Sequence, residues 1–166
     1  MTRAITCTTR PPRPGERQGV DYYFLDEEAF LKRMEAGEFL EHATVYGHWY
    51  GTPKAGVYKQ LLLGKDVLLN IDVQGAATVC AQAPLDAQLQ RSLVTVFLAP
   101  QNLAELEARL RKRGTDSPAE LQARLSAARE EIEQGRHFQH WITSATVEED
   151  LRQLEAIIQA ERLRQR

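Results

Sequence analysis

The chain has 166 residues, of which 43% are hydrophobic and 27% charged, a composition typical of one globular domain of ordinary size. Its 21 basic and 23 acidic side chains give a formal net charge of −2, which argues against nucleic acid as the main partner. No apolar run is long enough to span a membrane and the N-terminus has no hydrophobic leader, so we expect a cytoplasmic protein with no membrane partner.

The N-terminal region contains two predicted strands joined by a stiff arm. "RAITCT" at 3–8 alternates apolar and polar residues, and "GVDYYFL" at 19–25 is a second strand candidate. Between them, "TCTTRPPRPGE" at 6–16 carries three prolines, which fix φ and keep the backbone extended or turned. Arg10 and Arg13 on this arm suit phosphate recognition, because a guanidinium binds anions with a bidentate fork. Two ordinary arginines on a solvated loop explain this stretch equally well.

A helix and a hairpin are predicted next. Asp26 can cap a helix over 27–36, with Phe30 and Met34 on its apolar face and Gly37 after its end. "EFLEHATVYGHWYGTP" at 38–53 contains two strand-like pieces around a central glycine, the pattern of a hairpin. Residues 11–53 therefore predict a small antiparallel lobe.

The rest of the chain alternates strands and helices. "KDVLLNIDV" at 65–73 and "SLVTVFLAP" at 92–100 are nearly continuous aliphatic runs, which predict parallel strands covered on both faces. Amphipathic helices are expected at 102–114, ending at Gly114, at 117–135 after the capping box "SPAE", and from about Glu148, with Leu151, Leu154, Ile157 and Ile158 facing the core. This order favours an α/β fold.

Asp72 ends the first aliphatic run, where α/β sheets commonly bind ligands. Two roles fit this position. The carboxylate can be linked through water to a metal ion, or it can cap the helix that follows. The cysteines and histidines show no ligand spacing, so no metal site held by the protein itself is predicted.

Five segments carry a family resemblance: "TTRPPRPGE", "GVDYYF", "GEFLEHATVYGHWYGTP", "NIDVQGA" and "RLRKRGTDS". In this order and spacing, over nearly the whole chain, they resemble guanylate kinases, which phosphorylate GMP with ATP and Mg²⁺. The resemblance implies a P-loop NTPase-like, mostly parallel sheet that lacks its first strand. It further implies one domain over 1–166, with a GMP-binding lobe at 11–58, a helical lid at 110–136 and the remainder as core, acting as a monomer or homodimer.

The resemblance implies a GMP site built from donors for the phosphate and one acceptor for the base. Glu41 would read guanine, because one carboxylate can accept from both N1–H and the exocyclic amine, a donor pair that adenine lacks. Leaving that carboxylate unpaired makes the wrong base costly by about 1–3 kcal/mol. Taken singly, a tyrosine is more often a packing residue and a glutamate a surface charge. The implied GMP-binding residues are Thr6, Arg10, Arg13, Tyr22, Glu41, Tyr50, Thr52 and Asp72.

Three arginines are the implied catalytic residues. Arg109 and Arg113 lie four apart and share one helix face. With Arg124 they match the lid that closes over the phosphates, where cations would stabilise the charge of the transferred phosphoryl group. The alternative is a salt-bridged solvent face, since Glu105 and Glu107 are nearby.

The ATP half of the family pattern matches poorly. No stretch of the 166 residues fits the glycine-rich loop GxxxxGK[ST], Asn70 stands where the family has a carboxylate, and "SATVEED" around Ser144 replaces "NDDL". No ATP-loop residue is therefore predicted, and Mg²⁺ is expected only with ATP in the complete enzyme. We expect a guanylate kinase whose sequence is truncated at its N-terminus and that does not catalyse transfer by itself. The alternatives are a shortened module that binds GMP or a phosphopeptide, and a structural subunit that completes its sheet with another chain.

Overall fold

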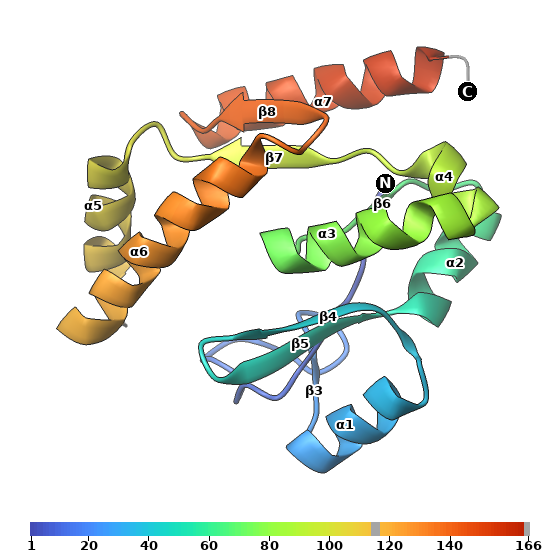
Figure 1. The fold of residues 1–166 in the computed structure, drawn as a ribbon, viewed down its shortest axis with the longest axis horizontal. Coiled ribbons are helices and arrows are strands. Elements are labelled where there is room, and N and C mark those ends of the chain that lie inside the picture. Colours follow the sequence, from blue (N-terminus) through green and yellow to red (C-terminus); the bar gives the residue numbers. More distant parts are fainter. Residues whose placement is uncertain (114–116, 165–166) are drawn as a thin grey trace. The chain divides into compact units, whose positions relative to one another are not determined.

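The computed structural model describes residues 1–113 and 117–164, apart from the side chain of Arg113. The chain divides into two compact units, Met1–Gln90 and Arg91–Arg166, which are described separately below as the first and the second unit (Figure 1).

The first unit is built around a four-stranded sheet. Its central hairpin turns at Tyr46 and Gly47, with φ values of 50° and 77°, the left-handed pair that a two-residue hairpin turn requires. The predicted hairpin is confirmed, but the first two strands pair in parallel, so the sheet is mixed rather than antiparallel. In spatial order the strands are β3 (Tyr23–Phe24), β2 (Cys7–Thr8), β5 (His48–Pro53) and β4 (Phe39–Val45).

The aliphatic run at 65–73 forms only a short strand. β6 (Val67–Leu68) pairs in parallel with β1 (Thr2–Arg3), which takes up the start of the predicted strand at 3–8. Leu68 is 36% exposed, so the prediction of a long strand covered on both faces is wrong here. A strand can pair only where its neighbour offers backbone N–H and C=O groups. β1 has two residues, so β6 pairs over two residues as well.

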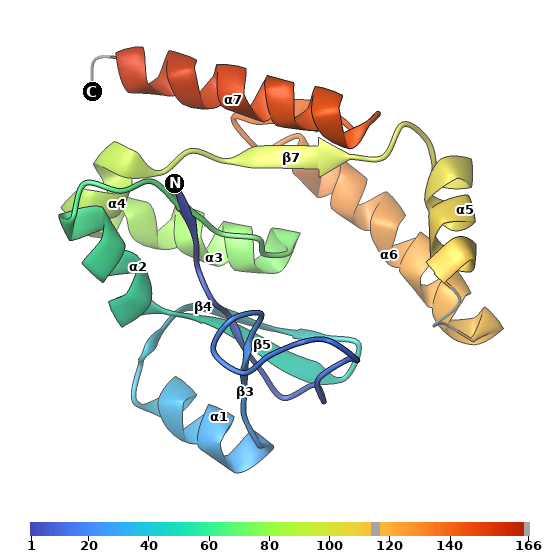
Figure 2. The same cartoon turned by 180° about the vertical axis from the view of Figure 1, so that it is seen from behind.

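The helices of the first unit follow their capping signals. α1 (Glu27–Glu35) starts at Asp26, whose carboxylate accepts from the amide of Ala29 at 2.7 Å, and Gly37 follows its end with φ 67°. Phe30 of α1 is fully buried and stacks on Phe39 at 4.6 Å between ring centroids. The remaining helices are α2 (Lys54–Leu62), α3 (Val73–Gln82) and η1 (Ala83–Leu85), followed by α4 (Ala87–Ser92), which starts in the first unit and ends in the second. α3 lies along β4 (Figure 2).

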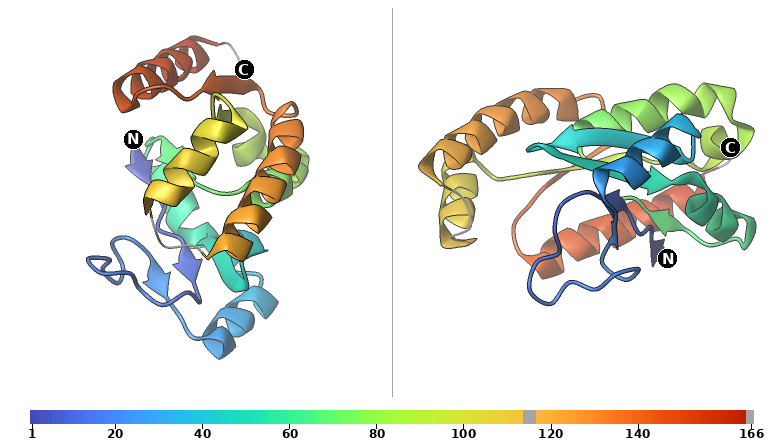
Figure 3. Two further views of the ribbon diagram at one scale, coloured as in Figure 1. Left: turned by 90° about the vertical axis from the view of Figure 1, so that its left-hand side faces the viewer. Right: turned by 90° about the horizontal axis from the view of Figure 1, so that it is seen from below.

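The described part of the second unit contains a parallel strand pair and three helices. α6 begins with the predicted capping box, in which Ser117 and Glu120 bond each other's backbone amides. α5 and α6 lie side by side (Figure 3, left). The elements are β7 (Val96–Ala99), β8 (His140–Thr143), α5 (Leu103–Arg113), α6 (Pro118–Gly135) and α7 (Val147–Leu163).

Two predictions for the second unit are wrong. Leu98 of β7 is 55% exposed and Leu151 of α7 is 49% exposed, although the patterns placed both in the core. β7 pairs only with β8 among the described strands, so an aliphatic run alone did not indicate two covered faces. Gly114, expected to end the preceding helix, lies outside the described residues.

Candidate functional site

Arg10 is held in place on the arm that follows β2. Its Nη2 lies 2.9 Å from both carboxylate oxygens of Glu16, and its Nη1 donates to the carbonyl of Pro11 at 2.6 Å. Burial lowers the pKa of Arg10, but hydrogen bonds with Glu16 and Tyr50 outweigh burial and raise it above the usual value. Arg10 is therefore a fixed, fully charged cation.

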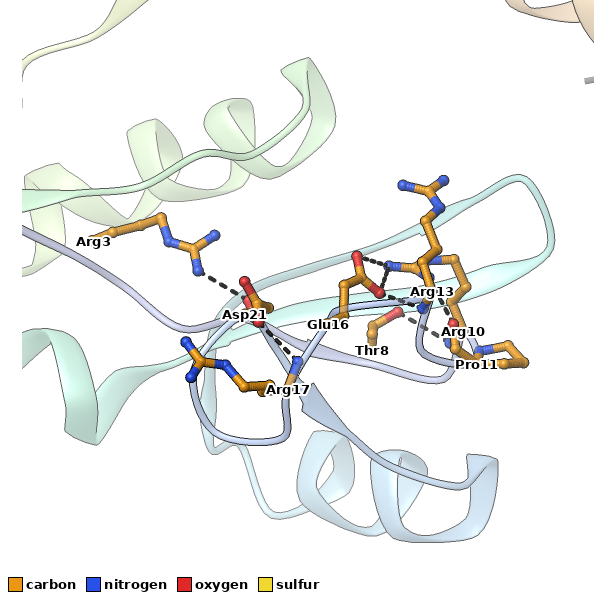
Figure 4. A network of polar contacts seen from close by, with 8 residues as sticks. All are labelled: Arg3, Thr8, Arg10, Pro11, Arg13, Glu16, Arg17 and Asp21. Atoms are coloured by element: carbon orange, nitrogen blue, oxygen red, sulfur yellow. Dashed lines mark hydrogen bonds and ion pairs between the residues drawn. The ribbon is translucent and has the colours of Figure 1, made fainter. Parts of the chain in front are cut away.

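Arg13 presents its charge outward. Its backbone amide donates to Glu16 at 2.7 Å, while its exposed guanidinium points away from the Arg10–Glu16 pair (Figure 4). This guanidinium donates no hydrogen bond to any described residue. Its donors are thus open to a ligand.

Two tyrosines lie beside Arg10. The Tyr22 and Tyr50 rings meet edge to face at 6.2 Å, and the Arg10 guanidinium lies 5.5 Å from the centroid of Tyr22. Both rings are half-buried. The structure therefore gathers three of the four residues predicted to bind phosphate, with Arg13 on the same short arm.

Glu41 is a buried carboxylate on the face of the hairpin that also carries Tyr50 and Thr52. Tyr50 and Thr52 are two residues apart on β5 and so point to the same side, whereas a side chain at Gly51 would meet Phe39 on the other side. A register shift between Phe39 and Glu41 breaks the alternation of β4 and turns Glu41 toward Thr52.

The environment of Glu41 disfavours its charge. Its side chain is 3% exposed, and its Oε1 accepts from the hydroxyl of Thr52 at 2.5 Å. Burial raises the pKa of Glu41 and the nearby Asp72 carboxylate raises it further, while the hydrogen bonds from Thr52 lower it; the net pKa is above the usual value. A raised acid pKa with a specific charged neighbour is a common mark of a functional group.

The first turn of α3 lies against Glu41. Asp72 caps this helix by accepting from the amide of Gly75 at 2.8 Å, so the capping role of Asp72 is confirmed. A Cβ atom at Gly75 would lie 2.6 Å from Oε2 of Glu41 and 3.2 Å from Asp72. Glu41, Thr52, Asp72 and Gly75 therefore form one group, called here the acidic cluster. The role of Gly75 was missed, and its only signal was a glycine early in a helix.

Thr6 stands apart from this arrangement. It lies just before β2, and its carbonyl accepts from the amide of Tyr23 at 2.9 Å. Its hydroxyl makes no hydrogen bond with a described residue. The structure fixes the backbone of Thr6 but gives its side chain no partner in the described part of the site.

The predicted lid arginines belong to the second unit. Arg109 pairs with Glu105 at 2.5 Å and with the hydroxyl of Ser144 at 3.4 Å, and Ser144 donates to Asp150 at 2.7 Å. This is the salt-bridged arrangement of the alternative interpretation. Arg124 is half-buried on α6, and the side chain of Arg113 lies outside the described residues.

The described part of the chain contains neither a cluster of metal ligands nor a membrane-spanning helix. No group of three or more His, Cys, Asp or Glu residues there could hold a metal ion. None of the helices described is both long and apolar enough to cross a membrane. Cys7 and Cys80 are free thiols.

Comparisons with known proteins agree with one another. The family model "Guanylate kinase" matches residues 1–161. Guanylate kinase of Synechococcus sp. (strain JA-3-3Ab) is 45% identical over 155 residues, which are 93% of this chain and 68% of that protein. A guanylate kinase of Thermus thermophilus is 45% identical over 161 residues, 97% of this chain and 70% of that protein. The crystal structure of guanylate kinase from Anaplasma phagocytophilum superimposes with a TM-score of 0.82 at 31% identity, covering 98% of this chain and 76% of that one.

Proposed function

This chain belongs to the guanylate kinase family, and we propose that it acts in the ATP-dependent phosphorylation of GMP to GDP, with the first unit as its GMP-binding part. We further propose that residues 1–166 form a single P-loop NTPase-like domain in the cytoplasm, with a GMP-binding lobe at 11–58 and a helical lid at 110–136. The family model extends over both units, which supports one domain.

Four side chains are proposed to bind the phosphate of GMP. Arg10 and Arg13 supply two guanidinium forks, and Tyr22 and Tyr50 supply hydroxyl donors. The charge of Arg10 and the open donors of Arg13 support this role. A phosphate dianion offers enough acceptor oxygens for all four groups.

The burial of Glu41 is the observation that carries the proposal. A carboxylate buried with hydrogen bonds from Thr52 alone among the described residues is unfavourable unless a ligand supplies further donors. Guanine has two adjacent N–H donors, on N1 and the exocyclic amine, and one carboxylate can accept from both. Thr52 keeps Glu41 oriented, Asp72 borders it at the start of α3, and Thr6 is proposed to border the ligand on the arm side.

The use of ATP as phosphoryl donor and the role of the helical lid are proposed from membership of the family. Arg109, Arg113 and Arg124 would stabilise charge on the transferred phosphoryl group. Mg²⁺ would arrive bound to ATP, because Mg²⁺ in kinases is held mainly by the nucleotide phosphates, by water and by one or two carboxylates.

One observation favours a second candidate, a module that binds without catalysing. The 166 residues contain no GxxxxGK[ST] stretch. Such a module would bind GMP or a phosphorylated peptide through the same arginines. A phosphoserine peptide, however, gives no reason for a buried carboxylate beside the cations, whereas guanine does.

Calorimetric titration of the purified chain tests the proposal. The ligands are GMP, AMP and a phosphoserine peptide, each at the same pH and ionic strength. We expect GMP to bind at least about tenfold more tightly than AMP, because AMP leaves Glu41 unpaired. Equal affinity for GMP and AMP, or preference for the peptide, would contradict it.

A further inference from the structure

We propose that Glu16 is a positioning residue of the phosphate site, which holds Arg10 and the backbone of Arg13 in the arrangement that binds the GMP phosphate. This inference rests on the proposed function. Glu16 would not touch the phosphate itself; it would act through Arg10.

The contacts of Glu16 close the arm into a ring. Its two carboxylate oxygens lie 2.9 Å from Nη2 of Arg10, and Oε2 also accepts from the amide of Arg13 at 2.7 Å. The Glu16 amide donates to the carbonyl of Arg13 at 3.0 Å. Glu16 therefore joins both ends of the segment that carries the two arginines (Figure 4).

The ion pair is shielded better than a typical surface pair. The side chains of Arg10 and Glu16 are only 12% and 18% exposed. The hydrogen bond from the Arg13 amide lowers the pKa of Glu16, partial burial opposes it, and Arg10 lowers it further, so the net pKa is below the usual value. Glu16 therefore remains a carboxylate at neutral pH.

Glu16 leaves donors for a ligand. A guanidinium has five N–H groups. The Nη2 group of Arg10 donates to the carboxylate of Glu16, and one N–H of Nη1 donates to the carbonyl of Pro11. Glu16 and Pro11 leave two N–H groups of Arg10 unused, on Nε and Nη1. Arg10 also hydrogen-bonds Tyr50, so one of the two remains for an anion.

If Glu16 positions Arg10, it should raise the affinity for phosphate; if Glu16 competes with phosphate for Arg10, it should lower this affinity. A long side chain that is already ordered loses less conformational entropy on binding, so Glu16 would strengthen the binding of phosphate. A carboxylate that merely competes for Arg10 would weaken it. The guanidinium of Arg13 points outward and is not paired with Glu16, so the arm at 6–16, with two arginines and one glutamate, keeps a positive net charge.

The test compares GMP with guanosine, which lacks the phosphate. Dissociation constants for both ligands are measured by calorimetry for the wild type, Glu16→Gln and the control Glu38→Gln, which removes an exposed carboxylate in the same unit. We expect Glu16→Gln to weaken GMP binding by about three- to tenfold and to leave guanosine binding unchanged. Unchanged guanosine binding also shows that the variant is folded.

A second variant shows whether Glu16 acts through Arg10. In an Arg10→Ala background, Glu16→Gln should weaken GMP binding less than it does in the wild type, because Arg10 is gone and only the backbone of Arg13 is left for Glu16 to hold. If the wild type binds GMP and the Glu16→Gln variant binds it equally or more tightly, this inference is overturned and the proposed function is not. A wild type that does not bind GMP would overturn the proposed function and the inference with it.

Discussion

The hydroxyl of Thr52 on β5 donates a 2.5 Å hydrogen bond to Oε1 of Glu41 on the facing strand β4, and both side chains are buried. The register shift before Glu41 creates this pair by turning the carboxylate to the side of Tyr50 and Thr52. A buried carboxylate that has few hydrogen-bond donors around it lowers the stability of the protein. Such a group is retained when it serves to bind a ligand.

Replacing Glu41 by Gln should separate ligand binding from stability. Gln keeps an oxygen that accepts from Thr52 but cannot accept from both donors of guanine. We expect GMP affinity to fall about 10- to 100-fold, which corresponds to about 1–3 kcal/mol, and the melting temperature not to fall. Calorimetry and thermal unfolding measure the two effects, with Glu38→Gln as the control. Wild-type GMP affinity in Glu41→Gln would show that Glu41 does not read the base.

The raised pKa of Glu41 predicts a pH dependence with opposite signs for binding and stability. Binding of guanosine should weaken as the pH falls through the raised pKa, because a protonated carboxyl cannot accept both N–H groups. The contribution of Glu41 to stability is full below its unfolded pKa and is lost as the pH rises through the raised folded pKa. Guanosine has no phosphate to titrate. The Glu41→Gln variant should show neither dependence, and a flat wild-type profile would speak against an ionised Glu41.

Two glycine-to-alanine changes form a matched pair. Gly56 in α2 has open space around a Cβ, so Gly56→Ala should stabilise the chain by about 1 kcal/mol through helix propensity. Gly75→Ala would place a Cβ 2.6 Å from Oε2 of Glu41, so it should displace the carboxylate and weaken GMP binding despite the same gain in propensity. Denaturant unfolding and GMP titration of both variants check this. Undiminished GMP affinity in Gly75→Ala would contradict the contact between α3 and Glu41.

Phosphoryl transfer by the 166-residue polypeptide alone is expected to be absent. Its sequence contains no GxxxxGK[ST] stretch to cradle the phosphates of ATP. A coupled assay for GDP, with purified chain, ATP, Mg²⁺ and GMP, should therefore show no turnover under conditions where GMP binds. Robust ATP-dependent GDP formation would mean that other residues of these 166 hold ATP.

Local signals in the sequence identified the elements that depend on neighbouring residues. The cap at Asp26, the glycine turn of the hairpin and the Ser117 capping box are all present in the structure. Each is set by hydrogen bonds or dihedral preferences within a few residues, so composition and spacing suffice to predict it. The resemblance then grouped Arg10, Tyr22 and Tyr50, which no local rule could do.

Features set by partners distant in sequence were not predictable. The lengths of β6 and β7 depend on what pairs with them, and the aliphatic runs gave no information on this. The register shift that turns Glu41 is a property of the ladder between β4 and β5, not of either strand. Glu16 was missed because an acidic residue within a cationic arm shows its role only when its contacts with Arg10 and Arg13 are seen; its spacing three residues after Arg13 was the available signal.

The most direct measurement is an NMR titration of the nitrogen-15-labelled chain with GMP. If the arm and the acidic cluster form one GMP site, the amides of Arg13 and Glu16 and those of Thr52 and Gly75 should shift together, with the same dissociation constant. Shifts confined to residues after Gln90, or to only one of the two groups, would contradict a single GMP site in the first unit.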